Sequence, residues 1–270
     1  MFPGAHTAPD DAAYAIVGAP LDRSTTFYPG TRFGPDLIRR VAYGFEDYDH
    51  HTDQQFSDLD VSDHGDVRPW QDAPAYLSFL SGELGDYVDR GTVPVVLGGE
   101  HTVSVAGVRA TDPSVYVAVD AHLDLRPSFD EDPWSHATVS HHVTEVVDEV
   151  VLLGVRAGAR AEWERARETD TITAIAPDAV ADWIESEVPT RPTYLSIDID
   201  GVDPAYAPGT GTPEPFGLAP TIVRDLVRAV APVAVGFDVV EVNDRDDGQA
   251  ATMAAKLVRS FVYTHATADV

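Results

Sequence analysis

The chain contains no cysteine, and this absence removes two classes of site. Disulfide bonds cannot form, and a metal centre built on thiolate sulfur is excluded. Basic residues are also scarce, because 18 Lys and Arg stand against 45 Asp and Glu and give a formal net charge of -27. Such a surface repels phosphate backbones and anionic lipids, so we expect neither nucleic acid nor a membrane as a partner.

Long apolar runs are missing as well. No stretch approaches the ~20 consecutive apolar residues that a membrane-spanning helix needs. The start, MFPGAHTAPDD, has neither the charged region nor the apolar region of a secretory signal, and we therefore expect a cytoplasmic protein. Lys256 is the only lysine. The acidic excess favours a halophilic protein in a very salty cytoplasm, where a Debye length of roughly 3 Å at 1 M salt screens the self-repulsion.

The chain does have a regular alternation of apolar β-branched runs and amphipathic segments. The predicted strands cover residues 14–20, 93–99, 115–120, 149–154, 171–175, 193–198 and 233–242. The predicted helices cover residues 34–45, 73–91, 104–110, 138–148, 158–168, 177–187, 218–232 and 248–266. This alternation indicates an α/β fold whose mainly parallel sheet is covered on both faces. No change of composition marks a linker, so we expect residues 1–270 to form a single domain.

Three polar clusters directly follow predicted strands. GGEH ends at His101, DAHLD spans residues 120–124, and SIDIDGVDP contains two further aspartates. In an open parallel sheet, the carboxyl ends of the strands form the crevice where ligands bind. We therefore expect six donor side chains to meet there, namely His101, Asp120, His122, Asp124, Asp198 and Asp200.

Carboxylates at the ends of buried strands are costly unless something neutralises them. If the strand continues through DAHLD, then Asp120, His122 and Asp124 share one face. Two divalent cations would neutralise the group, and mixed carboxylate and imidazole donors suit Mn²⁺ better than a closed structural zinc site. A single DxD pair is more often a capped turn, and GGEH alone could be a tight turn opening a helix. Together, the three clusters predict a two-metal hydrolase.

These motifs resemble the ureohydrolases, the family of arginase and agmatinase, and most closely an agmatinase of salt-loving archaea. The resemblance extends from GAPLDRSTTFYPGTRFGPDLIR through GGEH, DAHLD, SHAT and SIDIDGVDPAYAPGTGTPEP to DVVEVN. It implies a three-layer α/β/α arginase-like fold, two Mn²⁺ per subunit and hydrolysis of a guanidino group to urea. It also implies a homo-oligomer, either a trimer or a hexamer.

The resemblance further implies a role for each candidate residue. The ligands of the first ion would be His101, Asp120, Asp124 and Asp198. The ligands of the second ion would be Asp120, His122, Asp198 and Asp200. His136 in SHAT would relay protons, and Glu241 in DVVEVN would hold the substrate guanidinium. His141 and His142 are expected to be ordinary helix residues, and Asp203 to fix its loop.

The expected reaction is hydrolysis of agmatine to urea and putrescine, a step of polyamine biosynthesis. We expect a metal-bridging hydroxide to attack the guanidinium carbon, after which Asp124 passes a proton to the departing amine. His136 would then exchange protons with solvent. The acidic segment 130–132 offers charge that suits the ammonium end of agmatine.

Alternative functions stay open on the sequence. Formimidoylglutamase, which shares DAHLDLR, and guanidinobutyrase would use Arg126 to bind a substrate carboxylate. Formimidoylglutamases typically have serine where this chain has His136, and arginases have an asparagine-rich loop that is missing between Asp124 and His136. Ala137 and Asp244 replace residues that are usually glycine and often proline in the family. An inactive oligomeric binding protein is a further alternative, against which the complete set of six ligands argues.

Overall fold

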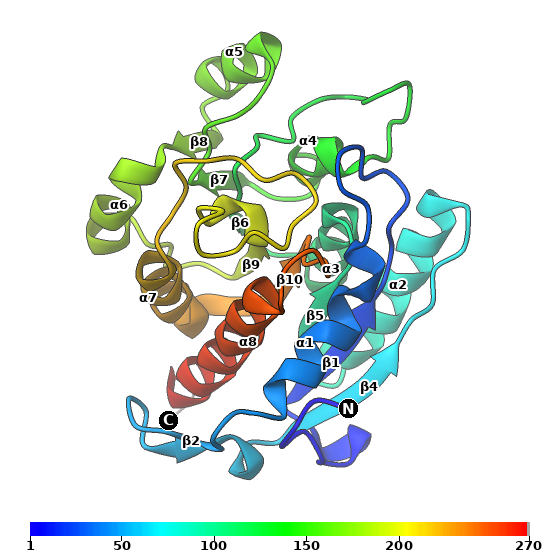
Figure 1. The fold of residues 1–270 in the computed structure, drawn as a ribbon, viewed down its shortest axis with the longest axis vertical. Helices are drawn as coiled ribbons and strands as arrows, with labels where there is room; N and C mark the ends of the chain where they lie inside the picture. Colours follow the sequence, from blue (N-terminus) through cyan, green and yellow to red (C-terminus); the bar gives the residue numbers. More distant parts are fainter. Residues whose placement is uncertain (269–270) are drawn as a thin grey trace.

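A computed structural model describes residues 1–268 and places an eight-stranded sheet at the centre of this part of the chain (Figure 1). The strands are β1 (Tyr14–Ala19), β4 (Val61–Asp66), β5 (Val93–Gly98), β6 (Val115–Val119), β7 (Glu149–Leu153), β8 (Ile172–Ile175), β9 (Thr193–Asp198) and β10 (Ala234–Val240). Their order is β4-β1-β5-β10-β9-β6-β7-β8, and neighbouring strands pair in parallel. The prediction of a mainly parallel sheet is confirmed.

Helices cover both faces of the sheet, which confirms the α/β/α layers (Figure 1). The core on one face includes residues of α1 (Gly34–Ala42), α6 (Val180–Ser186), α7 (Pro220–Val230) and α8 (Gln249–Ala268). The cores on the other face include residues of α2 (Ala73–Val88), α3 (Ser104–Thr111), α4 (Val139–Val143) and α5 (Arg160–Glu168). Within residues 1–268, no helix is both long enough and apolar enough to cross a membrane.

Strand β6 shows why the apolar runs predicted strands correctly. Val115, Val117 and Val119 face the core on one side of the sheet, while Tyr116 and Ala118 face the core on the other. Both faces of a parallel sheet are covered by helices, so its strands are apolar at every position rather than at alternate ones. The five residues of β6 are accordingly all buried.

Strand β4 was not predicted, because its sequence VSDHGD lacks an apolar run. It lies at the edge of the sheet and pairs with β1. Its Asp63 is buried against Arg39 of α1, whose Nε and Nη2 atoms donate hydrogen bonds of 2.8 Å to the carboxylate. The ion pair makes a polar residue compatible with this buried position.

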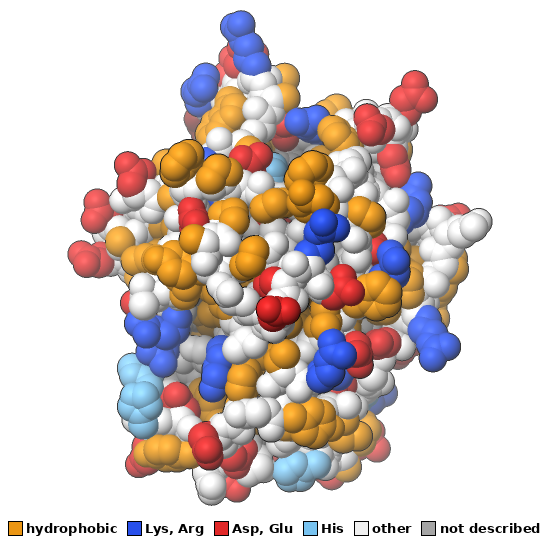
Figure 2. Space-filling model, viewed as in Figure 1, with side chains coloured by type: hydrophobic (Ala, Val, Ile, Leu, Met, Phe, Trp, Pro, Cys, Tyr) orange, Lys and Arg blue, Asp and Glu red, His pale blue; other side chains and the backbone are white. Residues whose placement is uncertain are grey.

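Two other local predictions differ from the structure. The helix predicted over residues 138–148 is wrong in length, because α4 ends at Val143 and residues 144–146 form a turn. A small antiparallel hairpin of β2 (Tyr48–Asp49) and β3 (Gln54–Gln55) was not predicted. On the face seen in Figure 2, acidic side chains are scattered rather than gathered in one patch.

Candidate metal centre

The middle of the sheet brings the predicted site residues to one edge. Strands β5, β10, β9 and β6 are neighbours, and their carboxyl ends lie side by side. His101 follows β5, Glu241 follows β10, Asp198 ends β9 and Asp120 follows β6. Ligand sites of open parallel sheets lie at this edge. Residues far apart in the sequence therefore meet because their strands are adjacent.

The first group of donors surrounds His101. Its Nδ1 atom lies 3.1 Å from Oδ2 of Asp120, 3.1 Å from Oδ2 of Asp124 and 3.4 Å from Oδ2 of Asp198. All four residues are buried. The donor atoms of His101, Asp120 and Asp124 lie close enough together to hold one cation, and Asp198 lies next to them through its contact with His101.

The second group surrounds His122. Its Nδ1 atom lies 3.0 Å from Oδ2 of Asp200 and 3.6 Å from Oδ1 of Asp120. Asp120 therefore presents one oxygen to each group, as expected for a carboxylate that bridges two cations. The structure brings together all six residues that the sequence analysis selected as ligands.

The local backbone differs from the predicted one. The expectation that Asp120, His122 and Asp124 lie on one face of a continuous strand is wrong, because β6 ends at Val119. Asp120 instead caps a turn, since its Oδ1 accepts a hydrogen bond of 2.6 Å from the backbone N–H of His122. Asp198 likewise accepts a bond of 2.8 Å from the N–H of Asp200. Each DxD-type spacing thus contains a capped turn and, at the same time, a pair of candidate ligands.

Within residues 1–268, histidines are the only basic side chains that contact the carboxylates of this cluster. Burial, followed by Asp200 and Asp120, raises the pKa of Asp198 well above its ordinary value. Burial and Asp120 raise the pKa of Asp124 to about 7. Burial lowers the pKa of His122, but Asp200 and Asp120 outweigh it and raise that pKa to about 12. Within residues 1–268, no Arg or Lys forms an ion pair with these carboxylates. The raised pKa values mean that His122, Asp124 and Asp198 hold protons more strongly than usual when no metal ion is bound.

The donor set fits two divalent cations. Oδ2 of Asp120 is buried and accepts no well-aligned hydrogen bond within residues 1–268. Carboxylate oxygens and imidazole nitrogens without sulfur suit Mn²⁺ and related ions. A bound cation would give this oxygen a partner and remove the repulsion among the carboxylates.

Glu241 lies beside the first group in an unusual backbone conformation. Its φ is 62°, a left-handed value that is uncommon for residues other than glycine and is often found at functional sites. Oε1 accepts a hydrogen bond of 2.8 Å from the backbone N–H of His101, while Oε2 is buried without a hydrogen-bond partner in the described part of the chain. Burial and Glu100 raise the pKa of this carboxyl well above its usual value. One oxygen is thus held by the fold and the other is available.

A cavity of about 350 Å³ opens beside the candidate metal ligands. His122, Asp124 and His136 line it, together with Arg126, Phe129, Glu162, Thr212 and Glu214 among others. His136 begins a short 3₁₀ helix whose cap is Ser135, and its Nδ1 lies 3.1 Å from Oγ of Ser24. Burial and then the positive charge on His122 lower the pKa of His136 to about 4. His136 is therefore neutral near pH 7.

The cavity wall corrects the prediction about its acidic residues. The segment 130–132 does not line the cavity, and Asp132 instead pairs with Arg23 at 2.8 Å. Glu214 is an acid that does line it, with Oε1 4.0 Å from Nε2 of His122. Arg126 lines it too, but its Nε donates a bond of 2.9 Å to the buried carboxylate of Glu162.

Several residues that support the ligands were not recognised in the sequence. Nε2 of His101 lies 3.1 Å from the hydroxyl of Tyr116 and 3.4 Å from that of Ser196. Asp238, fully buried inside the apolar run of β10, accepts hydrogen bonds from Ser196 at 2.6 Å and Tyr194 at 2.8 Å. An aspartate in the middle of an apolar strand was the only available signal.

The remaining histidines and acids near the site have structural contacts. His142 stacks on Trp134 at 3.9 Å, and His141 lies 2.7 Å from Nη1 of Arg165. Neither histidine lines the cavity. Asp203 accepts backbone hydrogen bonds of 2.9 Å and 3.0 Å from Ala205 and Gly217, and it holds the loop after β9.

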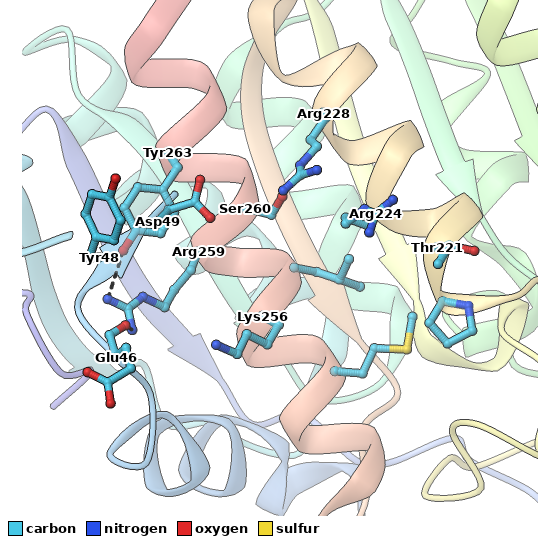
Figure 3. Close-up of a pocket in the computed structure, with 13 residues that line it drawn as sticks. Glu46, Tyr48, Asp49, Thr221, Arg224, Arg228, Lys256, Arg259, Ser260 and Tyr263 are labelled. Carbon is cyan, nitrogen blue, oxygen red and sulfur yellow. Dashed lines mark hydrogen bonds between the residues drawn. The ribbon is translucent and has the colours of Figure 1, made fainter. Parts of the chain in front are cut away.

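A second cavity, of about 290 Å³, lies between α7, α8 and the segment 46–49, which includes β2 (Figure 3). Its lining includes both basic and acidic residues, among them Arg224, Arg228, Lys256, Arg259, Glu46 and Asp49. None of the six candidate ligands lines it. The candidate ligands His122 and Asp124 instead line the cavity that His136 also lines.

Comparisons with known proteins agree with this geometry. Residues 12–263 match the model of the arginase family. An N(1)-aminopropylagmatine ureohydrolase of Thermococcus kodakarensis is 35% identical over 260 residues, which cover 93% of this chain and 90% of that protein. An agmatinase of Pyrococcus horikoshii is 36% identical over 264 residues, with coverages of 92% and 90%. The crystal structure of agmatine ureohydrolase of Thermoplasma volcanium is 32% identical, has a TM-score of 0.93, and covers 98% of this chain and 94% of its own.

Proposed function

The chain belongs to the arginase family, whose members hydrolyse guanidino C–N bonds. We propose that it converts agmatine to urea and putrescine. The observation that carries the proposal is the convergence of six ligand side chains beside a cavity of about 350 Å³. The wall of that cavity includes a carboxylate, Glu214, that suits a substrate with a cationic end.

We assign two Mn²⁺ to the six residues. His101, Asp120, Asp124 and Asp198 would hold one ion, and Asp120, His122, Asp198 and Asp200 would hold the other. When bound, two such ions would lower the pKa of a water between them towards neutrality and supply a nucleophile. Asp120 and Asp198 would be shared, which agrees with the two differently directed oxygens of Asp120.

The protein side chains would orient the substrate and move protons. Glu241 would accept hydrogen bonds from the guanidinium through Oε2, because its other oxygen is fixed by the N–H of His101. Asp124 is both a candidate ligand and a cavity residue, so it can carry a proton to the departing amine. His136, neutral near pH 7, would exchange protons between the cavity and solvent.

Substrate choice follows from the charges on the cavity wall. The Arg126 charge is largely neutralised by the buried Glu162, while Glu214 has no basic ion-pair partner within residues 1–268 other than His122 at 4.0 Å. An amine end of the substrate would therefore be favoured over a carboxylate end. This supports agmatine over guanidinobutyrate and formimidoylglutamate.

N(1)-aminopropylagmatine is a second candidate substrate. The ureohydrolase of Thermococcus kodakarensis named for this compound is 35% identical to the chain. This compound also ends in an amine, so Glu214 would suit it equally.

A substrate panel tests the proposal. Consumption of agmatine, N(1)-aminopropylagmatine, guanidinobutyrate, arginine and formimidoylglutamate would be followed chromatographically with the Mn²⁺-loaded protein. We expect at least about tenfold higher kcat/KM for an amine-ended substrate, a difference of about 1.4 kcal/mol. Glu214→Gln should raise KM for that substrate, whereas the matched change Glu131→Gln, outside the cavity, should not. No turnover of any compound with two ions bound would favour the inactive binding protein instead.

The cellular setting is a further part of the proposal. We propose a cytoplasmic trimer or hexamer in polyamine biosynthesis, adapted to high salt. The support is the family, together with the net charge of -27 and the acidic side chains scattered over the face seen in Figure 2. Light scattering would give the oligomer size, and thermal unfolding should show a lower Tm after dialysis from molar salt into dilute buffer.

A further inference from the structure

Ser24, in the loop after β1, makes two contacts with His136. Its Oγ accepts a hydrogen bond of 2.8 Å from the backbone N–H of His136 and lies 3.1 Å from Nδ1 of the ring. The two residues are 112 positions apart in the sequence. The other ring nitrogen, Nε2, has no hydrogen-bond partner within residues 1–268, and the ring lines the cavity. The contact thus fixes one edge of the ring and leaves the other edge free.

Glu100 holds Ser24 in place. Its Oε2 accepts hydrogen bonds of 2.6 Å and 2.7 Å from the backbone N–H groups of Arg23 and Ser24, and its Oε1 accepts one of 2.7 Å from Thr102. Glu100 is fully buried, so these donors replace the water that a carboxylate would otherwise need. Its neighbour His101 is a candidate ligand. The GGEH turn therefore supports both the metal site and the loop that contacts His136.

Two more contacts keep this loop against the turn and against the segment before His136. A side chain at Gly99 would place Cβ 1.9 Å from the carbonyl oxygen of Leu21, so only glycine allows the close approach of the loop. Arg23 pairs with Asp132 at 2.8 Å, four residues before His136. The loop is thus attached both to the GGEH turn and to the segment before His136.

The hydrogen positions follow from this arrangement. The Ser24 hydroxyl hydrogen has two acceptors within reach, the Glu100 carboxylate and Nδ1 of His136. Oε2 of Glu100 already accepts two N–H groups, whereas Nδ1 has only two hydroxyls as donors, that of Ser24 at 3.1 Å and that of Ser135 at 3.4 Å. A neutral imidazole that accepts at Nδ1 carries its hydrogen on Nε2. We propose that Ser24, held by Glu100, is a positioning residue that keeps His136 with its Nε2–H directed to the cavity. The inference rests on the proposed function of His136 as a proton relay.

Removal of the hydroxyl tests the inference. Ser24→Ala should lower kcat about tenfold, the lower end of the effect of losing an outer-shell partner, while KM and bound metal stay unchanged. Ser24→Thr keeps a hydroxyl and should restore most of kcat. Thr25→Ala is the matched control, because Oγ1 of Thr25 is buried but has no hydrogen-bond partner in the described chain. An equal loss in Thr25→Ala, or no loss in Ser24→Ala, would overturn the inference.

A double-mutant cycle separates positioning from general damage. In a His136→Asn background, Ser24→Ala should cause no further loss, because both changes remove the same contribution. A further tenfold loss would mean that Ser24 acts independently of His136 and would also overturn the inference. If His136→Asn alone left turnover unchanged, the proposed relay function would fail.

A spectroscopic measurement tests the ring itself, whatever the turnover of the His136 variant. Ring ¹⁵N NMR of histidine-labelled, Mg²⁺-loaded protein should show His136 as the Nε2–H tautomer. In Ser24→Ala this signal should become a mixture of the two tautomers. An Nδ1–H tautomer in the unaltered protein would contradict the inference.

Discussion

Two groups of buried aspartates in this molecule are neutralised in opposite ways. At the sheet edge, Asp63 pairs with Arg39, and hydrogen bonds with that guanidinium outweigh burial and lower the pKa of Asp63. At the centre, burial and other carboxylates raise the pKa of Asp198 well above its ordinary value. The exposed fractions of the two side chains are 0% and 4%. Burial alone therefore does not decide the pKa, and the central group needs cations from outside the chain.

The largest expected effect comes from an acid of the central group. Asp198→Asn should lower kcat/KM at least about 10³-fold, equivalent to about 4 kcal/mol of transition-state stabilisation. It should also reduce bound Mn²⁺ from two ions to one or none, because both ions would share this carboxylate. Substrate turnover and elemental analysis of dialysed protein measure the two quantities. Full turnover with two bound ions would remove Asp198 from the site.

Replacement of Asp63 should lower stability and leave activity unchanged, the opposite of the result expected for Asp198. Asp63→Asn leaves the buried Arg39 without its full partner and should lower the free energy of unfolding by about 3 kcal/mol. The kcat of the folded fraction should remain unchanged, because Asp63 lies on the edge strand β4, which β1 separates from the strands that carry the candidate ligands. Denaturant unfolding provides the measurement. A change below about 0.5 kcal/mol, typical of a surface substitution, would show that the pair is not a stabilising element.

Bound Mn²⁺ should raise the free energy of unfolding only when the central aspartates are intact. At a free Mn²⁺ concentration of 100 times Kd, one binding site adds about 2.7 kcal/mol to the free energy of unfolding. Thermal unfolding with and without a chelator should show this gain in the unaltered protein and in Asp63→Asn. In Asp198→Asn the gain should shrink. A Tm that is independent of Mn²⁺ in all three proteins would contradict the distinction.

The contribution of the Asp63–Arg39 pair to the free energy of unfolding should depend on pH. The folded pKa of Asp63 is lowered, so its contribution is fully present above the unfolded value of about 3.9 and is lost as pH falls through the folded pKa. The stability difference between the unaltered protein and Asp63→Asn should therefore shrink at acid pH. Urea unfolding at a series of pH values measures it. A difference that stays constant down to the lowest pH would rule out this linkage.

The sequence correctly predicted those features that depend only on the residues within a single strand or motif. Buried parallel strands are apolar throughout, so runs such as VYVAV identified them, and the polar clusters after them marked the ligand edge. Strand β4 was missed because Asp63 depends on Arg39 from a distant helix. The path of DAHLD was mistaken because Asp124, with a φ of 51°, departs from a strand conformation. Such features depend on tertiary contacts, which no periodicity records.

The same reasoning explains what the sequence did not show about the cavity. Arg126 looked free to bind a substrate carboxylate, but Glu162, 36 positions away, accepts its Nε hydrogen bond. The acids of 130–132 were close to His136 in sequence but not on the cavity wall, whereas Glu214 reaches that wall from the loop after β9. In these cases the sequence showed the charge of each side chain but not its ion-pair partner or its position relative to the cavity.

The most direct test of the two-cation account is an anomalous difference map from crystals grown with Mn²⁺. The account predicts two peaks per chain, one among His101, Asp120, Asp124 and Asp198, and one among Asp120, His122, Asp198 and Asp200. A map without peaks at these residues under saturating Mn²⁺, or with ions bound elsewhere, would contradict it.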